Sequence, residues 1–366
     1  MTTSSQDTLR VGVIGLGFAG HTHLKSYLQV PGVEVVGLAG LETERLHQLG
    51  TEHKIPYLHE HWEDLLAHED IDVISVGTPT FLHAPITIAA LESGRHVLSE
   101  KPIAENAAAG VAMVQAAHRA GRVLQVAFNH RRRGDVATLH RYVEAGALGD
   151  IYHAKASWLR RNGIPGAGSW FTNLKMAGGG PLIDLGVHML DMALYLLGEP
   201  KVLAVSAATY SELGPQGRGA SPYSAKQVVG SAYEVEDLGT AFLRLSGGAT
   251  LLLEASWATY RESGDLYGVT LFGNDGGAEI RSKNYGWEDT LRIYRDENGV
   301  PVETRPEVPR GEGHLAVVRS FVEAIQSGDW KGHDGAEGLV RARVIEACYA
   351  SAREGREVPV DNSPVD

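Results

Sequence analysis

A lysine, a carboxylate and an imidazole in this chain could together move a proton and stabilise negative charge on an oxygen atom. Lys101 lies between Glu100 and Pro102, and Asp184 and His188 are four residues apart. An imidazole has an ordinary pKa of about 6.5, so it can give or take a proton near neutral pH. An ammonium group can hydrogen-bond an oxygen and favour its alkoxide form. These residues are therefore candidates for acid–base chemistry at a hydroxyl or carbonyl group.

The spacing around His188 predicts a helix with a polar face. Asp184, His188 and Asp191 would share one face, because residues three and four apart are neighbours on a helix. One alternative is a carboxylate that stabilises the helix dipole beside a core histidine, and another is a zinc site. No third ligand lies nearby in the sequence, so no metal is expected. The preceding glycines, Gly178–Gly180, are expected to let the backbone pass close to a ligand, which neither alternative explains. Other histidines are interpreted as exposed polar residues: His21, His23, His59 and His61.

A glycine pattern follows a short β-branched run near the N-terminus: Gly15-Leu16-Gly17-Phe18-Ala19-Gly20. Gly15 permits a tight turn, Gly17 lets the backbone approach a pyrophosphate, and Gly20 lets a helix pack close to the strand. The phosphates of a dinucleotide would lie at the N-terminus of that helix. The pattern alone also fits an ordinary glycine turn, but its place in a strand–turn–helix–strand unit favours dinucleotide binding.

The end of the second strand lacks the acid that usually binds the adenosine ribose. Gly40 occupies its place, so a 2′-phosphate would not be repelled there, and Arg45 could approach it. Glu42 could equally bind the ribose hydroxyls, and Arg45 could be a solvated helix residue. The cofactor is therefore NAD or NADP, with a slight preference for NADP.

The elements around these residues alternate between strand and helix up to residue 128. Apolar runs and turn residues predict a doubly wound parallel sheet with a glycine loop at its first crossover. Strands are expected at 10–14, 33–38, 73–76, 96–98 and 123–127, and helices at 19–29, 42–52, 62–67, 85–93 and 107–120.

After residue 129 the pattern changes to a helix and then longer strands joined by short turns. This texture predicts an α+β domain with a large, mostly antiparallel open sheet. The helix is expected near 137–145 and strands at 151–159, 202–210, 236–245, 250–257 and 267–272. The segment 211–233, rich in Gly, Pro and Ser, is expected to be a long loop, either a lid or an interface arm. The predicted domains are 1–128 and 129–366.

Bulk properties favour an ordinary globular enzyme. The 366 residues carry 43% hydrophobic and 21% charged residues, enough for about two domains. The formal net charge of -12 argues against a nucleic-acid partner, which needs a basic surface. The single cysteine, Cys348, lies in an apolar stretch and is expected to be a buried thiol in a reducing compartment. No apolar run predicts a membrane span and the N-terminus lacks a signal pattern, so a cytoplasmic protein is expected.

Together, the glycine pattern, Glu100-Lys101-Pro102 and the segment 178–191 resemble the glucose-fructose oxidoreductase, inositol dehydrogenase and rhizopine catabolism (Gfo/Idh/MocA) family of nicotinamide enzymes, over roughly 10–360. By itself Glu100-Lys101-Pro102 would indicate a surface salt bridge and a proline turn. The resemblance implies that Lys101 is the catalytic lysine, that Glu100 contacts a cofactor ribose and that a cis peptide precedes Pro102. It also implies that the C-terminal helices, 314–326 and 337–353, pack back on the first domain.

The resemblance assigns further roles near the nicotinamide. His188 would be the general base in oxidation and the general acid in reduction, Lys101 would hydrogen-bond the reacting oxygen, and Asp184 would orient the substrate. The sequence itself leaves open which group takes the proton. The implied cofactor-binding residues are Gly15, Leu16, Gly17, Phe18, Ala19, Gly20, Gly40, Glu42, Arg45, Gly77, Thr78, Pro79, His83, Glu100 and Lys101.

Polar and aromatic residues of the second domain are candidates for a polyhydroxylated substrate. Arg160, Arg161 and Trp170 are the main ones, and Lys101, Asp184 and His188 would act at the reacting carbon. Asn129, just past the last parallel strand, is a further candidate. The alternative is that Trp158 and Trp170 fill the core while the arginines face water.

These observations predict an NAD(P)-dependent dehydrogenase acting on a secondary hydroxyl or keto group of a sugar, sugar derivative or cyclitol. One alternative is glycoside elimination or hydrolysis with internally recycled NAD. Another is a non-catalytic cofactor-sensing regulator, against which the presence of Lys101, Asp184 and His188 counts. The resemblance also implies a homodimer or homotetramer.

Overall fold

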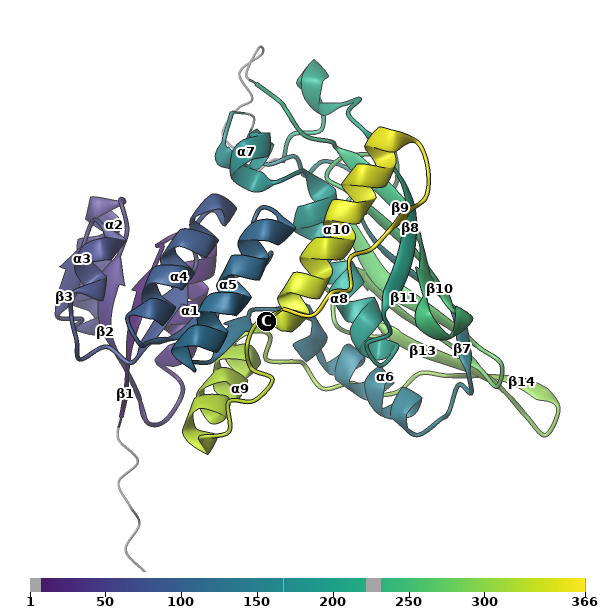
Figure 1. Ribbon diagram of the computed structural model, residues 1–366. Helices are drawn as coiled ribbons and strands as arrows, with labels where there is room; N and C mark the ends of the chain where they lie inside the picture. Colours follow the sequence, from purple (N-terminus) through teal and green to yellow (C-terminus); the bar gives the residue numbers. More distant parts are fainter. Residues whose placement is uncertain (1–7, 167, 222–231, 366) are drawn as a thin grey trace, which may run out of the picture. The chain divides into compact units, whose positions relative to one another are not determined.

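The strand and helix alternation predicted for the N-terminal part is present in the computed structural model, which describes residues 8–166, 168–221 and 232–365. The strands of the first sheet are β1 (Leu9–Ile14), β2 (Val33–Ala39), β3 (Tyr57–His59), β4 (Val73–Val76), β5 (His96–Ser99) and β6 (Leu124–Val126). Their order is β3-β2-β1-β4-β5-β6, and every neighbouring pair is parallel. The predicted doubly wound parallel sheet is therefore confirmed (Figure 1).

Helices connect these strands and cover the sheet. They are α1 (Phe18–Tyr27), α2 (Thr43–His53), α3 (Trp62–Leu66), the 3-10 turn η1 (Thr80–Leu82), α4 (His83–Glu92), α5 (Ala107–Ala120) and, from the C-terminal part of the chain, α9 (His314–Ser327). The bounds of α5 follow from its caps, because the Asn106 side chain accepts from the Ala109 amide and Gly121 takes a left-handed conformation at the other end.

Helix α9 packs beside α1 against the parallel sheet. Leu24 and Tyr27 of α1 and Phe321 of α9 are fully buried in one apolar cluster with Val11 and Val13 of β1. A C-terminal segment thus completes the core of the N-terminal sheet, and the first residue of α9 is brought close to the strand ends.

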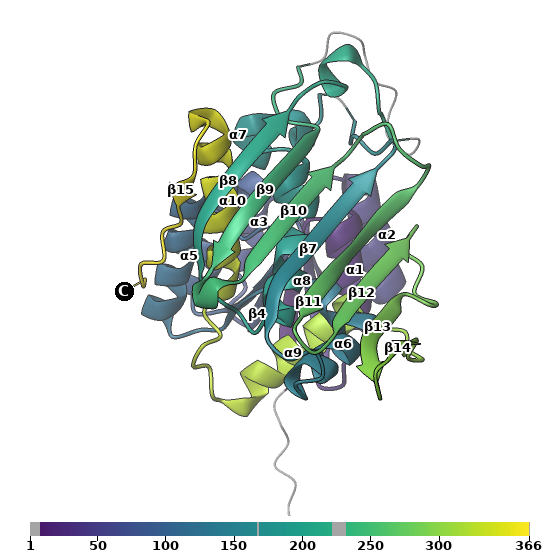
Figure 2. The same cartoon turned by 90° about the vertical axis from the view of Figure 1, so that its right-hand side faces the viewer.

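The second sheet has nine strands. Its strands are β7 (Ile151–Arg160), β8 (Val202–Tyr210), β9 (Leu238–Leu245), β10 (Thr250–Ser256), β11 (Asp265–Gly273), β12 (Gly277–Lys283), β13 (Leu291–Glu297), β14 (Val300–Thr304) and β15 (Val358–Pro359). The order is β14-β13-β12-β11-β7-β10-β9-β8-β15, antiparallel everywhere except between β7 and β10 (Figure 2). The mostly antiparallel sheet predicted from the sequence is confirmed.

Burial alternates along the central strands, so one face of this sheet is covered and the other is not. The remaining elements are η2 (Asn129–Arg132), α6 (Gly134–Glu144), η3 (Trp170–Thr172), α7 (Leu174–Ala177), the π-helix η4 (Leu182–Gly186), α8 (Val187–Leu196), η5 (Gly214–Gln216), η6 (Ser246–Gly248) and α10 (Ala336–Glu354). Helix α8, almost wholly buried, contacts β7 and β11 from the covered face.

The chain divides into two units between Asn129 and His130, one residue from the predicted boundary. The first unit also takes in Gly313–Leu339, and the second comprises His130–Glu312 and Val340–Pro364. Of the two C-terminal helices expected on the first domain, α9 belongs to the first unit, whereas most of α10 belongs to the second.

Two further expectations concern loops and membranes. Within the predicted loop 211–233, residues 222–231 lie outside the described part, and the preceding residues contain the short turn η5.

Among the described residues, none of the helices combines the length and apolar character needed to cross a bilayer.

Candidate active site

The glycine loop between β1 and α1 brings three backbone segments close together. Gly15 has a φ of +92°, and a Cβ there would lie 2.5 Å from the Gly77 carbonyl oxygen. A Cβ at Gly20 would lie 1.8 Å from the Gly15 carbonyl oxygen, so a larger residue fits neither position. By contrast, nothing lies within 4 Å of the place where a Gly17 Cβ would be. The loop is tightly packed on one side and open at Gly17.

Helix α1 begins at this open place without a side-chain cap. Gly17 is its N-cap residue, and its first turn holds no acidic side chain. The first amides of a helix have no partner within the helix and favour an anion. The open glycine and the uncapped helix therefore fit the pyrophosphate of a dinucleotide.

Gly40 is enclosed by its neighbours at the end of β2. A Cβ there would lie 2.6 Å from Leu16 Cγ and 3.2 Å from Glu42 Oε2, so the Glu42 carboxylate folds back toward the strand end. Arg45 is half-buried, and its Nε makes no hydrogen bond to the described residues. The Glu42 carboxylate thus lies near Gly40, which stands where an acid is usually found. The Arg45 guanidinium belongs to a residue about one helical turn further along.

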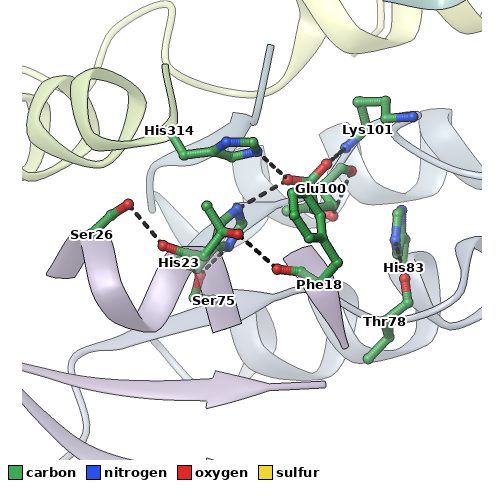
Figure 3. Close-up of polar contacts among 11 residues, drawn as sticks. Phe18, His23, Ser26, Ser75, Thr78, His83, Glu100, Lys101 and His314 are labelled. Carbon is green, nitrogen blue, oxygen red and sulfur yellow. Dashed lines mark hydrogen bonds and ion pairs between the residues drawn. The ribbon is translucent and has the colours of Figure 1, made fainter. Parts of the chain in front are cut away.

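His83 bridges two loops at the same edge of the sheet. Its Nδ1 lies 2.8 Å from the Pro102 carbonyl oxygen and its Nε2 3.0 Å from that of Thr78. The ring is 1% exposed, and burial lowers its pKa. A neutral imidazole donates only one hydrogen bond, so the ring serves one carbonyl at a time. His83 therefore binds the backbone of the loop at Thr78, and Figure 3 shows its ring beside that residue.

Glu100 and Lys101 follow β5 at this edge. Glu100 Oε2 accepts a hydrogen bond of 3.0 Å from the Lys101 backbone amide, and the peptide between Lys101 and Pro102 is cis, as expected. Glu100 is buried, whereas Lys101 is half-buried. The carboxylate of one residue thus holds the backbone of the next.

Two histidines that sequence reasoning did not select bind the same carboxylate. His23 Nε2 lies 3.1 Å and His314 Nε2 3.2 Å from Glu100 Oε1 (Figure 3). The interpretation of His23 as an exposed residue is wrong, because its side chain is fully buried. Gly20, His23, Leu24 and Tyr27 are all buried, so they form the inner face of α1. That helical spacing was the available signal.

In the second unit, Asp184 lies in a π-helical turn and is held by an indole. Trp257 Nε1 donates to Asp184 Oδ2 at 2.9 Å, and Trp257 is fully buried. The turn Leu182–Gly186 precedes α8, which carries His188. Trp257 follows β10 and was not selected from the sequence, because its contact with Asp184 spans 73 residues.

His188 is packed among aromatic rings and is 7% exposed. The ring centroids of His130 and His188 are 4.5 Å apart, and Trp158 lies 5.8 Å from His188. Trp158 itself is 3% exposed and stacks on Tyr267. It therefore belongs to the core, while its ring forms one wall around His188.

Asp191 does not act with Asp184 and His188, contrary to the shared face that the spacing predicted. It is fully buried, and its carboxylate binds Arg131 and Arg341. Arg341 also binds Glu199 at 2.7 Å. This network anchors α8 to η2 and α10.

Gly179 and Gly180 make room for other residues of the protein, so the interpretation that they make room for a ligand is wrong. A Cβ at Gly179 would lie 2.0 Å from the Tyr349 hydroxyl, and one at Gly180 would lie 2.2 Å from the Glu236 carbonyl oxygen. The buried Glu236 carboxylate accepts from the Gly180 and Leu182 amides and from Tyr349 Oη. It thereby fixes the start of the turn that holds Asp184.

The candidate substrate residues differ in the contacts that they already make within the protein. Arg160 binds Asp265 at 3.0 Å and the Tyr285 hydroxyl at 2.6 Å, while Arg161 lies over the Tyr260 ring. Trp170 is half-exposed and stacks on Phe171 at 3.8 Å, and Asn129 is half-exposed.

A cavity of about 670 Å³ lies in the first unit, at the amino ends of the strands. Its arginines already bind backbone carbonyls, Arg95 those of His68 and Ile71 and Arg122 that of Gly94. Ligands of open parallel sheets bind at the opposite, carboxyl edge, where Gly77 and Glu100 lie. This cavity is therefore not assigned to the chemistry.

Comparison with known families gives two adjacent matches. Residues 9–128 match the model described as "Oxidoreductase family, NAD-binding Rossmann fold", and residues 136–279 match the "GFO/IDH/MocA C-terminal domain". The matches follow the two sheets along the chain.

Individual relatives span nearly the full length. The chain is 32% identical to the D-glucoside 3-dehydrogenase of Escherichia coli (strain K12), over 96% of this chain and 97% of that one. It is 28% identical to the levoglucosan dehydrogenase of Pseudarthrobacter phenanthrenivorans, over 96% and 98%. A solved levoglucosan dehydrogenase in complex with NADH and levoglucosan superposes with a TM-score of 0.83 at 26% identity, covering 97% of this chain and 100% of that one.

Proposed function

Because this chain belongs to the Gfo/Idh/MocA oxidoreductase family, we propose that it transfers a hydride between NAD(H) and a secondary hydroxyl or keto group of a sugar or glycoside. The relatives named for D-glucoside and levoglucosan support a pyranose substrate. Cyclitols remain in the class expected from the sequence. The first candidate for the reacting position is the 3-hydroxyl of a glucoside, which the name of the 32% identical relative specifies.

The proposed reaction breaks a carbinol C–H bond and an O–H bond and forms a carbonyl group. Bound nicotinamide supplies the hydride acceptor. The imidazole of His188 takes the hydroxyl proton, and Lys101 Nζ hydrogen-bonds the reacting oxygen and favours its alkoxide character. Asp184, its carboxylate plane fixed by Trp257, orients the substrate. In reduction the same proton returns from His188 to the oxygen.

The observation that carries this proposal is the glycine loop. Its tight contacts at Gly15, Gly20 and Gly77, its open face at Gly17 and the uncapped start of α1 together suit a dinucleotide. The cofactor-binding set would be residues 15–20, 77–79 and 100–101, with His83 ordering the two loops. Glu100 would contact the nicotinamide ribose.

Glu42 favours NAD over NADP in this proposal. Its carboxylate folds back over Gly40, where it can accept from the adenosine ribose hydroxyls and would repel a 2′-phosphate. Arg45 is the group that would favour NADP, the cofactor slightly preferred from the sequence alone. The NADH in the levoglucosan dehydrogenase complex supports the first choice.

Asn129, Arg160, Arg161 and Trp170 are proposed to select the substrate together with Lys101, Asp184 and His188. The half-exposed indole of Trp170 offers a face for the C–H surface of a sugar. Arg160 is held by Asp265 and Tyr285, which fixes the direction of its remaining N–H groups.

We also propose a homodimer or homotetramer in which the uncovered face of the nine-stranded sheet is buried. That face carries half-exposed apolar residues on four neighbouring strands: Leu159, Phe242, Leu252 and Phe272. Light scattering from the purified protein measures the assembly directly.

The test of function is the growth of reduced-nicotinamide absorbance with a panel of glucosides, anhydrosugars and cyclitols, using NAD and NADP separately. Growth with one sugar establishes the dehydrogenase and its cofactor. If dinucleotide binds but no sugar is oxidised, the proposal fails. Products released without net reduction would then indicate a recycled cofactor, and no products would indicate a sensor.

A further inference from the structure

Glu100 is a buried carboxylate that accepts three hydrogen bonds. His23 and His314 approach Oε1 at 3.1 and 3.2 Å, and the Lys101 amide donates to Oε2 at 3.0 Å. Glu100 is 7% exposed, so these donors replace most of the water that a carboxylate requires. Two segments that are distant in the sequence, α1 and α9, therefore converge on one side chain.

Each histidine is oriented by a second contact. The Ser75 hydroxyl on β4 lies 2.8 Å from His23 Nδ1, and the His23 ring is fully buried. If Ser75 donates to Nδ1, the Nε2 hydrogen of a neutral His23 points at Glu100. His314 is the first residue of α9, which is fixed by its packing on α1. Both donors are thus held before any ligand binds.

The charges around Glu100 keep it ionised. Burial alone would raise its pKa, but hydrogen bonds from His23 and His314 outweigh burial and hold the pKa well below its ordinary value. The titratable groups that face it are His23 on α1, His314 on α9, His83 on α4 and the adjacent Lys101. A charged carboxylate with both oxygens engaged has one preferred orientation.

We propose that His314, together with His23, is a positioning residue that fixes the Glu100 carboxylate and, through it, the backbone of Lys101. This inference rests on the proposed function, because Lys101 and Glu100 are there assigned to the reacting oxygen and the nicotinamide ribose. Helix α9 therefore contributes to the active site although it lies more than 200 residues from Glu100 in the sequence.

The same three ligand atoms lie within 4.8 Å of one another, a spacing that a metal ion could also use. The hydrogen-bonding account is preferred because Nε2 of each ring lies within hydrogen-bond distance of the same carboxylate oxygen, Glu100 Oε1. The two accounts differ experimentally: a stoichiometric metal in the purified protein, lost in His314→Leu, would overturn the positioning role.

The experiment compares His314→Leu, which removes the donor, with His314→Gln, which keeps an N–H donor. The control is His118→Leu, since His118 pairs with Asp334 elsewhere in the same unit. Fluorescence titration with NADH gives the dinucleotide Kd, and steady-state kinetics with the identified sugar gives kcat and KM. We expect His314→Leu to weaken NADH binding about 10-fold and to lower kcat about 100-fold, with an unchanged KM for the sugar. His314→Gln should stay within about 3-fold of the wild type.

The proposal would be overturned if His314→Leu and His314→Gln lost NADH affinity and kcat equally, or if neither variant lost any. If His314→Leu fails to fold, Ser75→Ala replaces it, because this change releases His23 without opening a large cavity. Like His314→Leu, Ser75→Ala should weaken NADH binding, by about 3-fold. The NADH titration needs no sugar, so an inactive wild type would refute the proposed function while leaving this inference testable.

Discussion

Trp257 Nε1 donates a 2.9 Å hydrogen bond to Asp184 Oδ2, which links a fully buried indole after β10 to a carboxylate in the π-helical turn before α8. Carboxylates turn freely about their last bond unless a donor fixes them. The indole cannot move, because the surrounding core encloses it. The bond therefore restrains the plane of the Asp184 carboxylate, the group proposed to orient the substrate.

Trp257→Phe should impair catalysis more than folding. Phenylalanine keeps most of the buried ring but removes the donor, so Asp184 loses its fixed plane. We expect kcat/KM to fall about 10-fold and the free energy of unfolding to fall by about 1–3 kcal/mol. Kinetics and urea unfolding measure the two effects. Unchanged kinetics would show that Asp184 needs no orientation from Trp257.

Lys101→Ala and His188→Ala should separate chemistry from dinucleotide binding. Each removes a group assigned to the reacting oxygen, whereas the glycine loop is untouched. We expect turnover to fall by about 100-fold or more in each variant, with NADH affinity within about 3-fold of wild type. Full turnover in both variants would remove these residues from the mechanism.

Glu42→Gln tests the choice of cofactor. Neutralising the carboxylate removes its repulsion of a 2′-phosphate and weakens its bonds to ribose hydroxyls, while Arg45 stays in place. The ratio of kcat/KM for NAD to that for NADP should fall about 10-fold or more. Glu63→Gln in α3 is the matched control. An unchanged ratio would show that Glu42 does not contact the ribose.

The sequence predicted what depends on local pattern. The pattern of apolar strands followed by glycine predicted the parallel sheet. The bounds of α5 and β4 agree with those predicted. Bonds between distant segments could not be predicted in this way. The contact of His314 with Glu100 depends on the return of α9 to the first sheet, and that of Trp257 with Asp184 depends on the packing of β10 against the turn.

Two errors have physical causes. Gly179 and Gly180 were assigned to a ligand, but the space that their missing side chains leave is filled by Tyr349 and Glu236. Asp191 was placed with His188 from helical spacing alone, yet its charge is buried against two arginines. In both cases the residue type was informative, while its partner lay too far along the chain to be identified.

His96 should make the protein less stable in acid. The ring is 7% exposed and its Nδ1 accepts from the Val123 amide at 3.1 Å. Burial, helped by the charge of Arg122, lowers the pKa of His96 to about 4. The unfolded chain, with a pKa of about 6.5, therefore binds a proton more readily than the folded one between these values. The stability that neutral His96 contributes is complete above about pH 6.5 and decreases as the pH falls toward 4.

The check is His96→Asn, whose side-chain oxygen can still accept from Val123 but does not titrate. Urea unfolding at pH 6.5 and at pH about 4.5 should show a smaller loss of stability on acidification in the variant than in the wild type. The exposed His61, changed in the same way, should leave the wild-type difference intact. If His96→Asn loses as much stability as the wild type, another group governs the acid response.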